Sequence, residues 1–311
     1  MHEHIARVLY YFEIHLLYAS LAGSAAWLLT ALPRGSATSK YWIWVAAALN
    51  FIVPAGAVID TVEASYLGWA RPLGLIGDVA YRMSQGPVAV ALLAVWLAGA
   101  GLMFTRLCLR LRAERREAPA ASGPQAQAHR GGFLAGGFPV SFEAGGQGPA
   151  VRGVLRPHIS LPEGIERLLT EHELDAVLVH ELTHARRRDN LVRLVYEVTL
   201  CLLWFHPLVW LAGNRLALYR ELSCDEAVTQ SARGRELVSA LAKLANPEEA
   251  FLLQASATSF ISLRLARLTG APLQRPGRAA SALLGVLFAG VLVACIFSTV
   301  AHTACCFVAK K

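Results

Sequence analysis

Hydrophobic residues occur mainly in long runs that shorter polar segments separate. The runs are Val8 to Leu32, Tyr41 to Ile59, Val88 to Leu107 and, near the C-terminus, Ala279 to Val300. About 20 consecutive apolar residues are enough to cross a bilayer as a helix. The first run is too long for the apolar part of a signal peptide, and no cationic segment precedes it, so we expect it to be retained. The pattern predicts a mainly α integral membrane protein with about four transmembrane helices.

Basic residues mark one end of these predicted spans. The arginines that crowd the exit of the third run are Arg106, Arg110, Arg112, Arg115 and Arg116. Cytoplasmic loops carry an excess of Lys and Arg, so this end is predicted to lie inside. Counting back, the loop with Arg34 and Lys40 also lies inside, whereas the mixed loop 60–87 and the N-terminus lie outside. The charges predict a multi-pass membrane protein whose N-terminus lies outside.

Composition agrees with a membrane protein. The chain of 311 residues is 55% hydrophobic and only 16% charged, against about 25% in an average soluble chain. The net charge of +7 would suggest a nucleic-acid partner if the arginines lined a soluble face. Because many of them follow apolar runs, membrane topology explains them, and no direct nucleic-acid binding is expected. The six cysteines show no paired spacing, which argues against a disulfide framework or a cysteine-based zinc ribbon.

The segment between the third and fourth spans has two parts. Residues 113–150 are rich in Ala, Gly, Pro and Gln, which is typical of a flexible tether, with a short hairpin around Phe138 to Phe142 as one option. From residue 151 the pattern tightens into short strands with a turn at Gly153, followed by helices. The predicted divisions are a three-span membrane region (1–112), a cytoplasmic tether (113–150), a folded cytoplasmic domain (151–275), and a fourth span with a short outside tail (276–311).

The folded domain contains a well-marked helix. Thr170 and Glu173 have the spacing of a capping box, and the apolar positions that follow recur at helical spacing. Basic residues end the helix, and Asp189 with Asn190 is expected to cap the next one. The amphipathic pattern from 214 to 244 predicts one further helix, and 252–268 predicts another.

The helix that begins near Thr170 carries an H-E-x-x-H motif, from His180 to His184. Residues four apart lie on one helix face, so both imidazoles can reach one metal ion. Glu181 lies on the neighbouring face and can take a proton from a water that the metal activates. Catalytic zinc sites use three protein ligands and keep one position open, so the motif predicts one Zn²⁺ ion and needs a third ligand.

The best third ligand downstream is Glu221, on a second helix. Asp225 follows it by one turn, and this E-x-x-x-D spacing allows a zinc-binding glutamate followed by a carboxylate that orients a ligating imidazole, here His180. Cys224 is a soft alternative ligand that would compete with Glu221 for the same position. The donor for the oxyanion stays open, with His206, Tyr219 and Arg220 as candidates by proximity in sequence.

The apolar segment 191–211 resembles a further span, but the predicted metal site excludes this. His180, His184 and Glu221 must meet at one ion, and a single crossing between them would put the ligands on opposite sides of the membrane. The segment is therefore expected to be a core helix, an interfacial helix or a hairpin that dips partway into the bilayer, with 204–210 at the interface.

Several segments in the same order resemble the BlaR/MecR family of membrane zinc metallopeptidases. They are residues 180–189, 204–210 and 220–228, with 153–159 as the turn before the motif helix. The resemblance implies a multi-pass protein of the bacterial cytoplasmic (inner) membrane, with three spans, a gluzincin-like zinc metallopeptidase domain that faces the cytoplasm, and a fourth span. It also implies cleavage of a transcriptional repressor or of the protein itself. The antibiotic receptors of this family carry an outside penicillin-binding domain after the fourth span, whereas this chain ends soon after it, so direct β-lactam sensing is not implied.

Three functions remain open at this point. The first is a regulatory metallopeptidase whose partners are a protein or peptide substrate and the lipid bilayer. The second is a housekeeping protease that removes damaged membrane proteins. The third is a non-catalytic receptor or adaptor, against which an intact Glu181 argues because a dead enzyme needs no base. A homo-oligomer is compatible with each of them.

Overall fold

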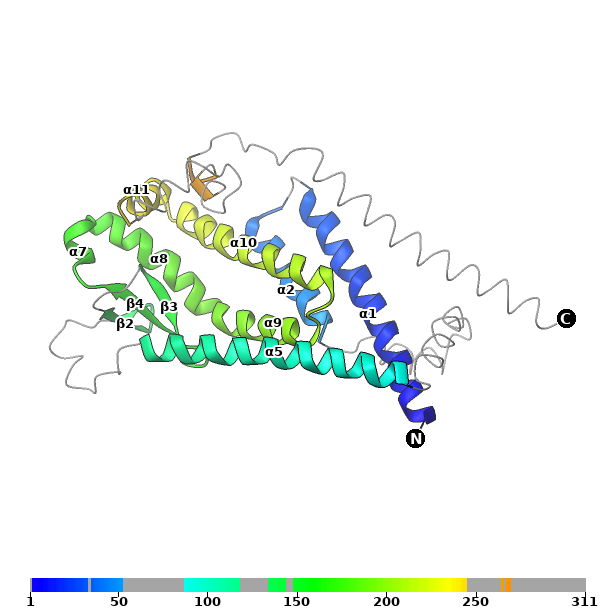
Figure 1. Cartoon of the computed structure of the whole chain (residues 1–311). Coiled ribbons are helices and arrows are strands. Elements are labelled where there is room, and N and C mark those ends of the chain that lie inside the picture. The colour runs from blue at the N-terminus through cyan, green and yellow to red at the C-terminus, as the bar shows by residue number, and fades with distance from the viewer. Residues whose placement is uncertain are drawn as a thin grey trace.

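The computed structural model describes residues 2–32, 35–52, 87–117, 134–143, 148–244, 264–265 and 267–269. These residues form a mainly helical molecule in which long helices lie side by side and a small sheet lies at one end (Figure 1). The predicted fourth span, nearly all of the predicted outside loop 60–87 and most of the predicted helix 252–268 lie outside the described residues.

The first two helices pack together as a hairpin. Helix α1 spans His2–Ala31 and α2 spans Ala37–Asn50, and Ser36 caps α2 by accepting a hydrogen bond from the Ser39 N–H. The buried Lys40 Nζ donates to the carbonyl oxygens of Thr30 at 3.0 Å and Leu32 at 2.6 Å, near the end of α1. The predicted second span, Tyr41 to Ile59, is helical only as far as Asn50 in the described residues, which end at Ile52.

Helix α5 (Pro87–Glu117) contains the predicted third span. The most apolar 18 residues of its stretch Val90–Glu114 have a mean hydropathy of 1.8, and only 6% of these residues are buried. Among the described residues it is the one stretch long and apolar enough to cross a membrane, judged by length and composition. The third span therefore has a matching helix, whereas the arrangement of four spans stays a prediction.

Part of the predicted tether is folded. Strands β1 (Leu134–Ala135) and β2 (Phe138–Glu143) join β3 (Ala150–Arg152) and β4 (His158–Pro162) in a sheet of order β1-β2-β4-β3. Strand β2 pairs parallel with β4, and β3 pairs antiparallel with β4 after a turn at Gly153, where φ is +82°. Val140 in β2 is buried in the same core as β4 and helix α8, which explains why this stretch does not behave as a linker.

Helix α8 (Glu171–Arg187) begins where the capping box predicts, after the short α7 (Ile165–Leu168). The Glu173 N–H donates to Thr170 Oγ1 at 3.3 Å, and the Thr170 N–H donates to Glu173 Oε2 at 2.7 Å. The Glu173 side chain also accepts from Ser239 Oγ at 2.5 Å and from Lys243 Nζ at 2.7 Å, both in α11 (Gly234–Leu244). One glutamate therefore begins α8 and ties it to α11.

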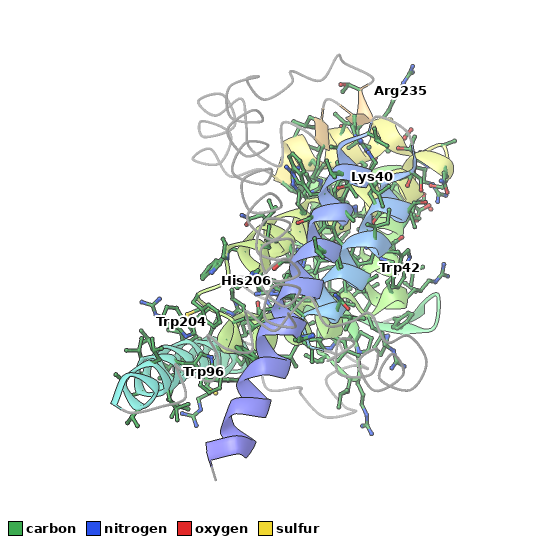
Figure 2. The ribbon with its side chains drawn as sticks, turned by 90° about the vertical axis from the view of Figure 1, so that its right-hand side faces the viewer. Lys40, Trp42, Trp96, Trp204, His206 and Arg235 are labelled. Atoms are coloured by element: carbon green, nitrogen blue, oxygen red, sulfur yellow. The ribbon has the colours of Figure 1, made fainter. Side chains whose placement is uncertain are left out.

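The ambiguous segment 191–211 forms a helical hairpin. Helix α9 (Asp189–Leu202) turns at 203–206 into α10 (Pro207–Gln230), so the segment is a pair of helices rather than one continuous span, and its depth relative to the bilayer stays a prediction. Its tip lies against α5: Trp96 Nε1 donates to the Leu202 carbonyl at 2.8 Å, and Trp96 and Trp204 lie close together (Figure 2). A side chain at Gly99 would collide with the Trp204 indole.

The prediction of one helix from 214 to 244 is wrong. Helix α10 ends at Gln230, and α11 starts at Gly234 after Ala232 adopts a left-handed φ of 58°. The break turns α11 back across α8, where Leu237 joins the core beneath the sheet. The other large core lies between α2 and α10, and its buried members include Tyr41, Trp44, Leu216, Tyr219 and Leu222.

Candidate metal centre

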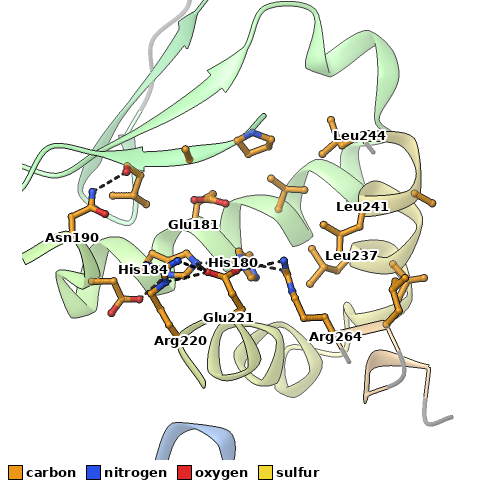
Figure 3. A pocket seen from close by; sticks show the side chains of 18 of the residues that line it. His180, Glu181, His184, Asn190, Arg220, Glu221, Leu237, Leu241, Leu244 and Arg264 are labelled. Atoms are coloured by element: carbon orange, nitrogen blue, oxygen red, sulfur yellow. Dashed lines mark hydrogen bonds and ion pairs between the residues drawn. The ribbon is translucent and has the colours of Figure 1, made fainter. Parts of the chain in front are cut away.

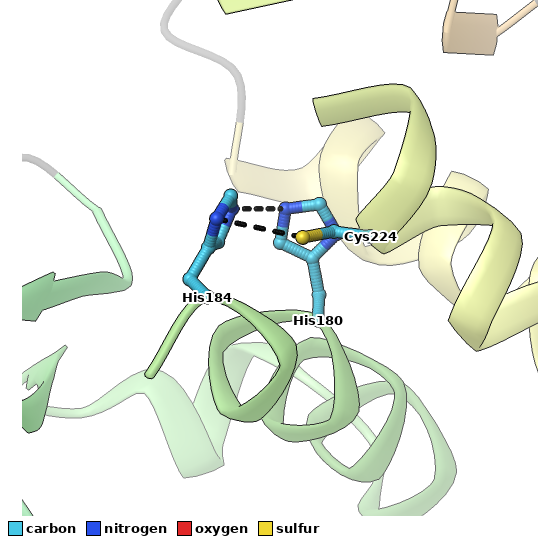
Figure 4. Close-up of side chains that lie close together, drawn as sticks. All are labelled: His180, His184 and Cys224. Carbon is cyan, nitrogen blue, oxygen red and sulfur yellow. Dashed lines mark hydrogen bonds between the residues drawn. The ribbon is translucent and has the colours of Figure 1, made fainter. Parts of the chain in front are cut away.

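The two motif histidines lie one turn apart on α8, as their spacing predicts. His180 is buried and His184 is nearly so. Their Nε2 atoms lie 3.3 Å apart, and the two rings meet edge to face (Figure 4). The two Nε2 atoms are therefore close enough to bind one metal ion.

Helix α10 brings the predicted carboxylate ligand to this point. Glu221 Oε2 lies 3.6 Å from His180 Nε2, and Glu221 Oε1 lies 3.8 Å from His184 Nε2. One turn later, Asp225 Oδ1 lies 3.2 Å from His180 Nδ1, a distance suited to a hydrogen bond although the angle is poor. The structure thus brings together the four residues predicted to bind or orient the metal.

Asp189 faces the other histidine, and its predicted role as a helix cap is wrong. Arg188 has a left-handed φ of 55° and serves as the N-cap of α9 without a side-chain hydrogen bond, so Asp189 falls in the first turn of α9. Its Oδ2 lies 2.6 Å from His184 Nδ1. Asn190 instead donates to the Val151 carbonyl at 2.8 Å, which ties α9 to β3. A carboxylate partner for the second histidine is a general feature of metal sites, and this rule could have found Asp189.

Arg264 is a site residue that sequence reasoning missed. Its Nε and Nη2 atoms each lie 2.9 Å from an oxygen of Asp225, which makes a two-pronged ion pair. Its Nη1 atom lies 3.4 Å from Glu221 Oε2. Arg264 lies 39 positions beyond Asp225, and no motif in the sequence connects the two.

A second set of three groups surrounds the histidines. His180, His184 and Cys224 each offer a ligand atom, and these atoms lie within 4.8 Å of one another. The thiol, however, lies 3.4 Å from His184 Nδ1 (Figure 4). The same Nδ1 atom faces Asp189 Oδ2 at 2.6 Å. Burial raises the pKa of the Cys224 thiol, which keeps it protonated. The two Nε2 atoms therefore converge with Glu221 rather than with Cys224.

The centre attracts positive charge. Burial lowers the pKa of His180, but contacts with Asp225 and Glu221 and the charge of Glu181 outweigh burial and raise this pKa to about 9. Burial raises the pKa of the Glu221 carboxyl, but the neighbouring histidines and Arg220 hold it well below its usual value. The same negative groups that hold a proton on His180 are suited to a metal cation.

A cavity of about 780 Å³ opens beside these side chains (Figure 3). Glu181 lines it together with both histidines and Glu221. The cavity is also lined by Leu237, Leu241 and Leu244 of α11, by Ala150 and Val151 of β3, and by Arg193, Arg220 and Arg264. Glu181 therefore shares the cavity with an apolar wall from α11, the backbone of β3 and three arginines.

The three candidates for the oxyanion donor lie in different places. His206 Nε2 lies 3.0 Å from Ser20 Oγ at the tip of the hairpin, and Tyr219 Oη donates to the Thr30 carbonyl at 3.2 Å. Both side chains are thus engaged with α1, away from the cavity. Arg220 alone of the three lines the cavity, and its Nη2 lies 3.0 Å from Glu221 Oε1.

A known protein family matches most of the chain, and individual relatives match a shorter part of it. A family model described as BlaR1 peptidase M56 matches residues 12–268. The regulatory protein BlaR1 of Bacillus licheniformis is 37% identical over 83 residues, which are 27% of this chain and 14% of that protein. The methicillin resistance mecR1 protein of Staphylococcus aureus is 25% identical over 89 residues, which are 29% of this chain and 15% of that protein. The matched stretches thus cover only a small part of these relatives.

Proposed function

The chain belongs to the BlaR1 peptidase M56 family, and on this premise we propose that it is a membrane-embedded zinc metalloendopeptidase that acts in regulatory proteolysis. The family resemblance that the sequence motifs indicate is confirmed. The observation that carries the proposal is the convergence of His180 Nε2, His184 Nε2 and the Glu221 carboxylate beside Glu181.

The donor set suits zinc. Asp225 and Asp189 face the Nδ1 atoms, so the Nε2 atom of each ring faces the position that Glu221 also faces, with Arg264 Nη2 3.5 Å from His180 Nε2. Two imidazole nitrogens and one carboxylate oxygen form a common ligand set of catalytic zinc, which keeps a fourth position open. His180, His184 and Glu221 would hold the ion, and the two aspartates would orient the rings.

The proposed reaction is peptide-bond hydrolysis. Bound zinc supplies a Lewis acid that polarises the substrate carbonyl and makes water more acidic. Glu181 takes a proton from the attacking water on its carboxylate and returns it to the leaving amine nitrogen. Arg220, at the wall of the cavity, is placed to donate to the developing oxyanion.

The cavity suits a peptide in extended form. Strand β3 is an edge strand of the described sheet and lines the cavity, so a peptide backbone can pair with it. The leucines of α11 offer an apolar surface for a side chain next to the cleaved bond. Two relatives are named a regulatory protein and a methicillin resistance protein, which supports a regulatory role, and the proposed substrate is a transcriptional repressor or the chain itself.

The proposed site faces the cytoplasm. The basic end of α5 contacts the helix that follows the motif: Arg110 forms an ion pair with Glu197, and Arg193 Nη2 lies 3.4 Å from Glu114 Oε1. Because α9 begins at Asp189 beside the metal centre, the site lies on the same side as this basic end. The positive-inside rule assigns that side to the cytoplasm.

A comparison of wild type with Glu181→Gln in native membranes tests the proposal. Mass spectrometry of new protein N-termini, including those of this chain, should show cleavages that require Glu181. Cleavage restricted to one repressor or to the chain itself supports the regulatory role, whereas many membrane-protein fragments would support the housekeeping role. Identical cleavage patterns in membranes with wild type and with Glu181→Gln would show that the protein is not a peptidase that depends on Glu181.

A further inference from the structure

Tyr41, in α2, makes a direct link to the metal centre. Its side chain is fully buried, and its hydroxyl donates to Asp189 Oδ1 at 2.7 Å. The other oxygen of the same carboxylate, Oδ2, faces His184 Nδ1 at 2.6 Å. A single carboxylate therefore joins a phenol of the N-terminal region to a metal-binding imidazole, across 148 positions of sequence.

Arg187 completes the surroundings of this carboxylate. Its Nη2 lies 2.5 Å from Asp189 Oδ2 and its Nε lies 3.2 Å from Oδ1. The guanidinium also stacks on the Tyr41 ring, with Cζ 4.4 Å from the ring centroid. Arg187 fixes the plane of the carboxylate from within α8, and Tyr41 supplies the remaining donor from outside the peptidase helices. A phenylalanine at position 41 would keep the stacking and lose only this donor.

Helix α2 cannot shift freely relative to the site. In its first turn, the Thr38 N–H and hydroxyl both donate to Glu226 Oε2 at 3.0 Å. Glu226 directly follows Asp225 in α10, the helix that also carries Glu221. Tyr41 comes one turn after Thr38. Helix α2 therefore contacts α10 through Thr38 and the start of α9 through Tyr41.

We propose that Tyr41 is a positioning residue for the metal site, acting through Asp189 on the orientation of His184. The inference rests on the proposed function, since it takes His184 as a ligand. The Tyr41 hydroxyl adds a second and shorter hydrogen bond to Asp189 Oδ1, so the carboxylate is held in one orientation and keeps the His184 ring aimed at the metal position. Helix α2, which the sequence assigns to the membrane region, thereby contributes to the metal affinity of a site on other helices.

The test measures Zn²⁺ affinity of the full chain in detergent micelles by competition with a chelating dye. Tyr41→Phe should weaken zinc binding about 3- to 10-fold, the effect of losing one buried hydrogen bond. It should also change the visible absorption spectrum of the Co²⁺-loaded protein, which reports ligand geometry. Tyr219→Phe is the matched control, because it removes a buried hydroxyl from the same core that bonds to Thr30 instead.

A double-mutant cycle separates positioning from general stability. In an Asp189→Asn background, Tyr41→Phe should cause no further loss of zinc affinity, because its route to His184 is already broken. Equal zinc affinity and Co²⁺ spectra in wild type and Tyr41→Phe would overturn the inference, as would an equal loss in both backgrounds or in Tyr219→Phe. Wild-type protein that binds no zinc would instead overturn the proposed function, and this inference with it.

Discussion

His184 Nδ1 lies 2.6 Å from Asp189 Oδ2, where α8 passes into α9. If His184 is a metal ligand, this carboxylate fixes both the tautomer and the direction of the ring. Asp189→Asn removes the charge and leaves an amide that matches the surrounding donors poorly. We expect zinc affinity to fall about 10- to 100-fold, the usual cost of losing such a partner.

The same competition assay on Asp175→Asn provides the control for Asp189. Asp175 lies on α8 as well, but its side chain is 43% exposed and pairs with Arg233 at the surface. Exposed ion pairs contribute little to stability, so this variant should keep the affinity of wild type. Equal losses in the two variants would show that Asp189 has no specific role at His184.

Substitutions at Glu221 and Cys224 distinguish the two candidate ligand sets. Glu221→Gln should reduce zinc affinity by more than the roughly 10- to 100-fold typical of an orienting residue, because it removes a ligand. Cys224→Ser should bind zinc with a stoichiometry close to wild type, since the thiol faces the Nδ1 side of His184. Competition with the chelating dye measures the affinity, and elemental analysis of the purified variants measures the stoichiometry. Retained zinc in Glu221→Gln with loss in Cys224→Ser would assign the site to the thiol.

The capping glutamate of α8 should make stability depend on acid. Hydrogen bonds from Lys243, Ser239 and the Thr170 backbone lower the pKa of Glu173 to about 2. A carboxyl whose pKa is lower in the folded than in the unfolded state stabilises the fold fully above its unfolded pKa. This stabilisation is lost as the pH falls from the unfolded value of 4.5 towards 2. Glu173→Gln should therefore be less stable than wild type at pH 7, and this gap should narrow steadily below about pH 4.5.

Denaturant unfolding of the detergent-solubilised protein between pH 7 and pH 3 measures the effect of Glu173→Gln. Glu171→Gln, at the exposed first residue of the same helix, controls for negative charge near a helix N-terminus. A gap between wild type and Glu173→Gln that is constant over the whole pH range would contradict the assigned pKa.

Close packing of the hairpin depends on Gly213. A Cβ atom at this position would overlap the Tyr196 hydroxyl, so α9 and α10 approach closely only because residue 213 has no side chain. Gly213→Ala should destabilise the protein by about 1–3 kcal/mol, the usual cost of overpacking. Adding Tyr196→Ala should restore part of this loss, and thermal unfolding of the single and double variants measures it.

Gly101→Ala in α5 is the matched control for Gly213, because a Cβ there meets nothing within 4 Å. Since alanine favours helix over glycine, this variant should be as stable as wild type or slightly more so. A Gly213→Ala protein as stable as Gly101→Ala would show that α9 and α10 can separate without cost.

Local signals in the sequence are enough to predict α8 and the placement of its two histidines on one face, but not the groups around them. The capping box at Thr170 and the spacing from His180 to His184 act within a few residues, so pattern reasoning reaches them. The sequence predicts that Asp189 caps α9, but the left-handed Arg188 takes the cap position, and residue spacing does not reveal this backbone conformation.

Long-range packing determines the remaining differences. Tyr41 and Arg264 meet the site only through tertiary contacts over 148 and 39 positions. Composition predicts a tether over 113–150 with a short hairpin as one option, whereas Val140 pairs with Ile159 of a strand that follows the tether. Apolar patterning also joined α10 to α11, since the break depends on the backbone of Ala232.

Helix α10 makes functional contacts on two faces, and this determines which fragments of the protein can fold. One face presents Glu221 and Asp225 to the metal centre, and the opposite core is closed by Tyr41 and Trp44 of α2. A recombinant fragment 151–275 would begin after α2 and leave that core open to water, with Leu222 newly exposed. Such a fragment should aggregate and bind zinc weakly. Activity measurements therefore require protein that retains its N-terminal helices.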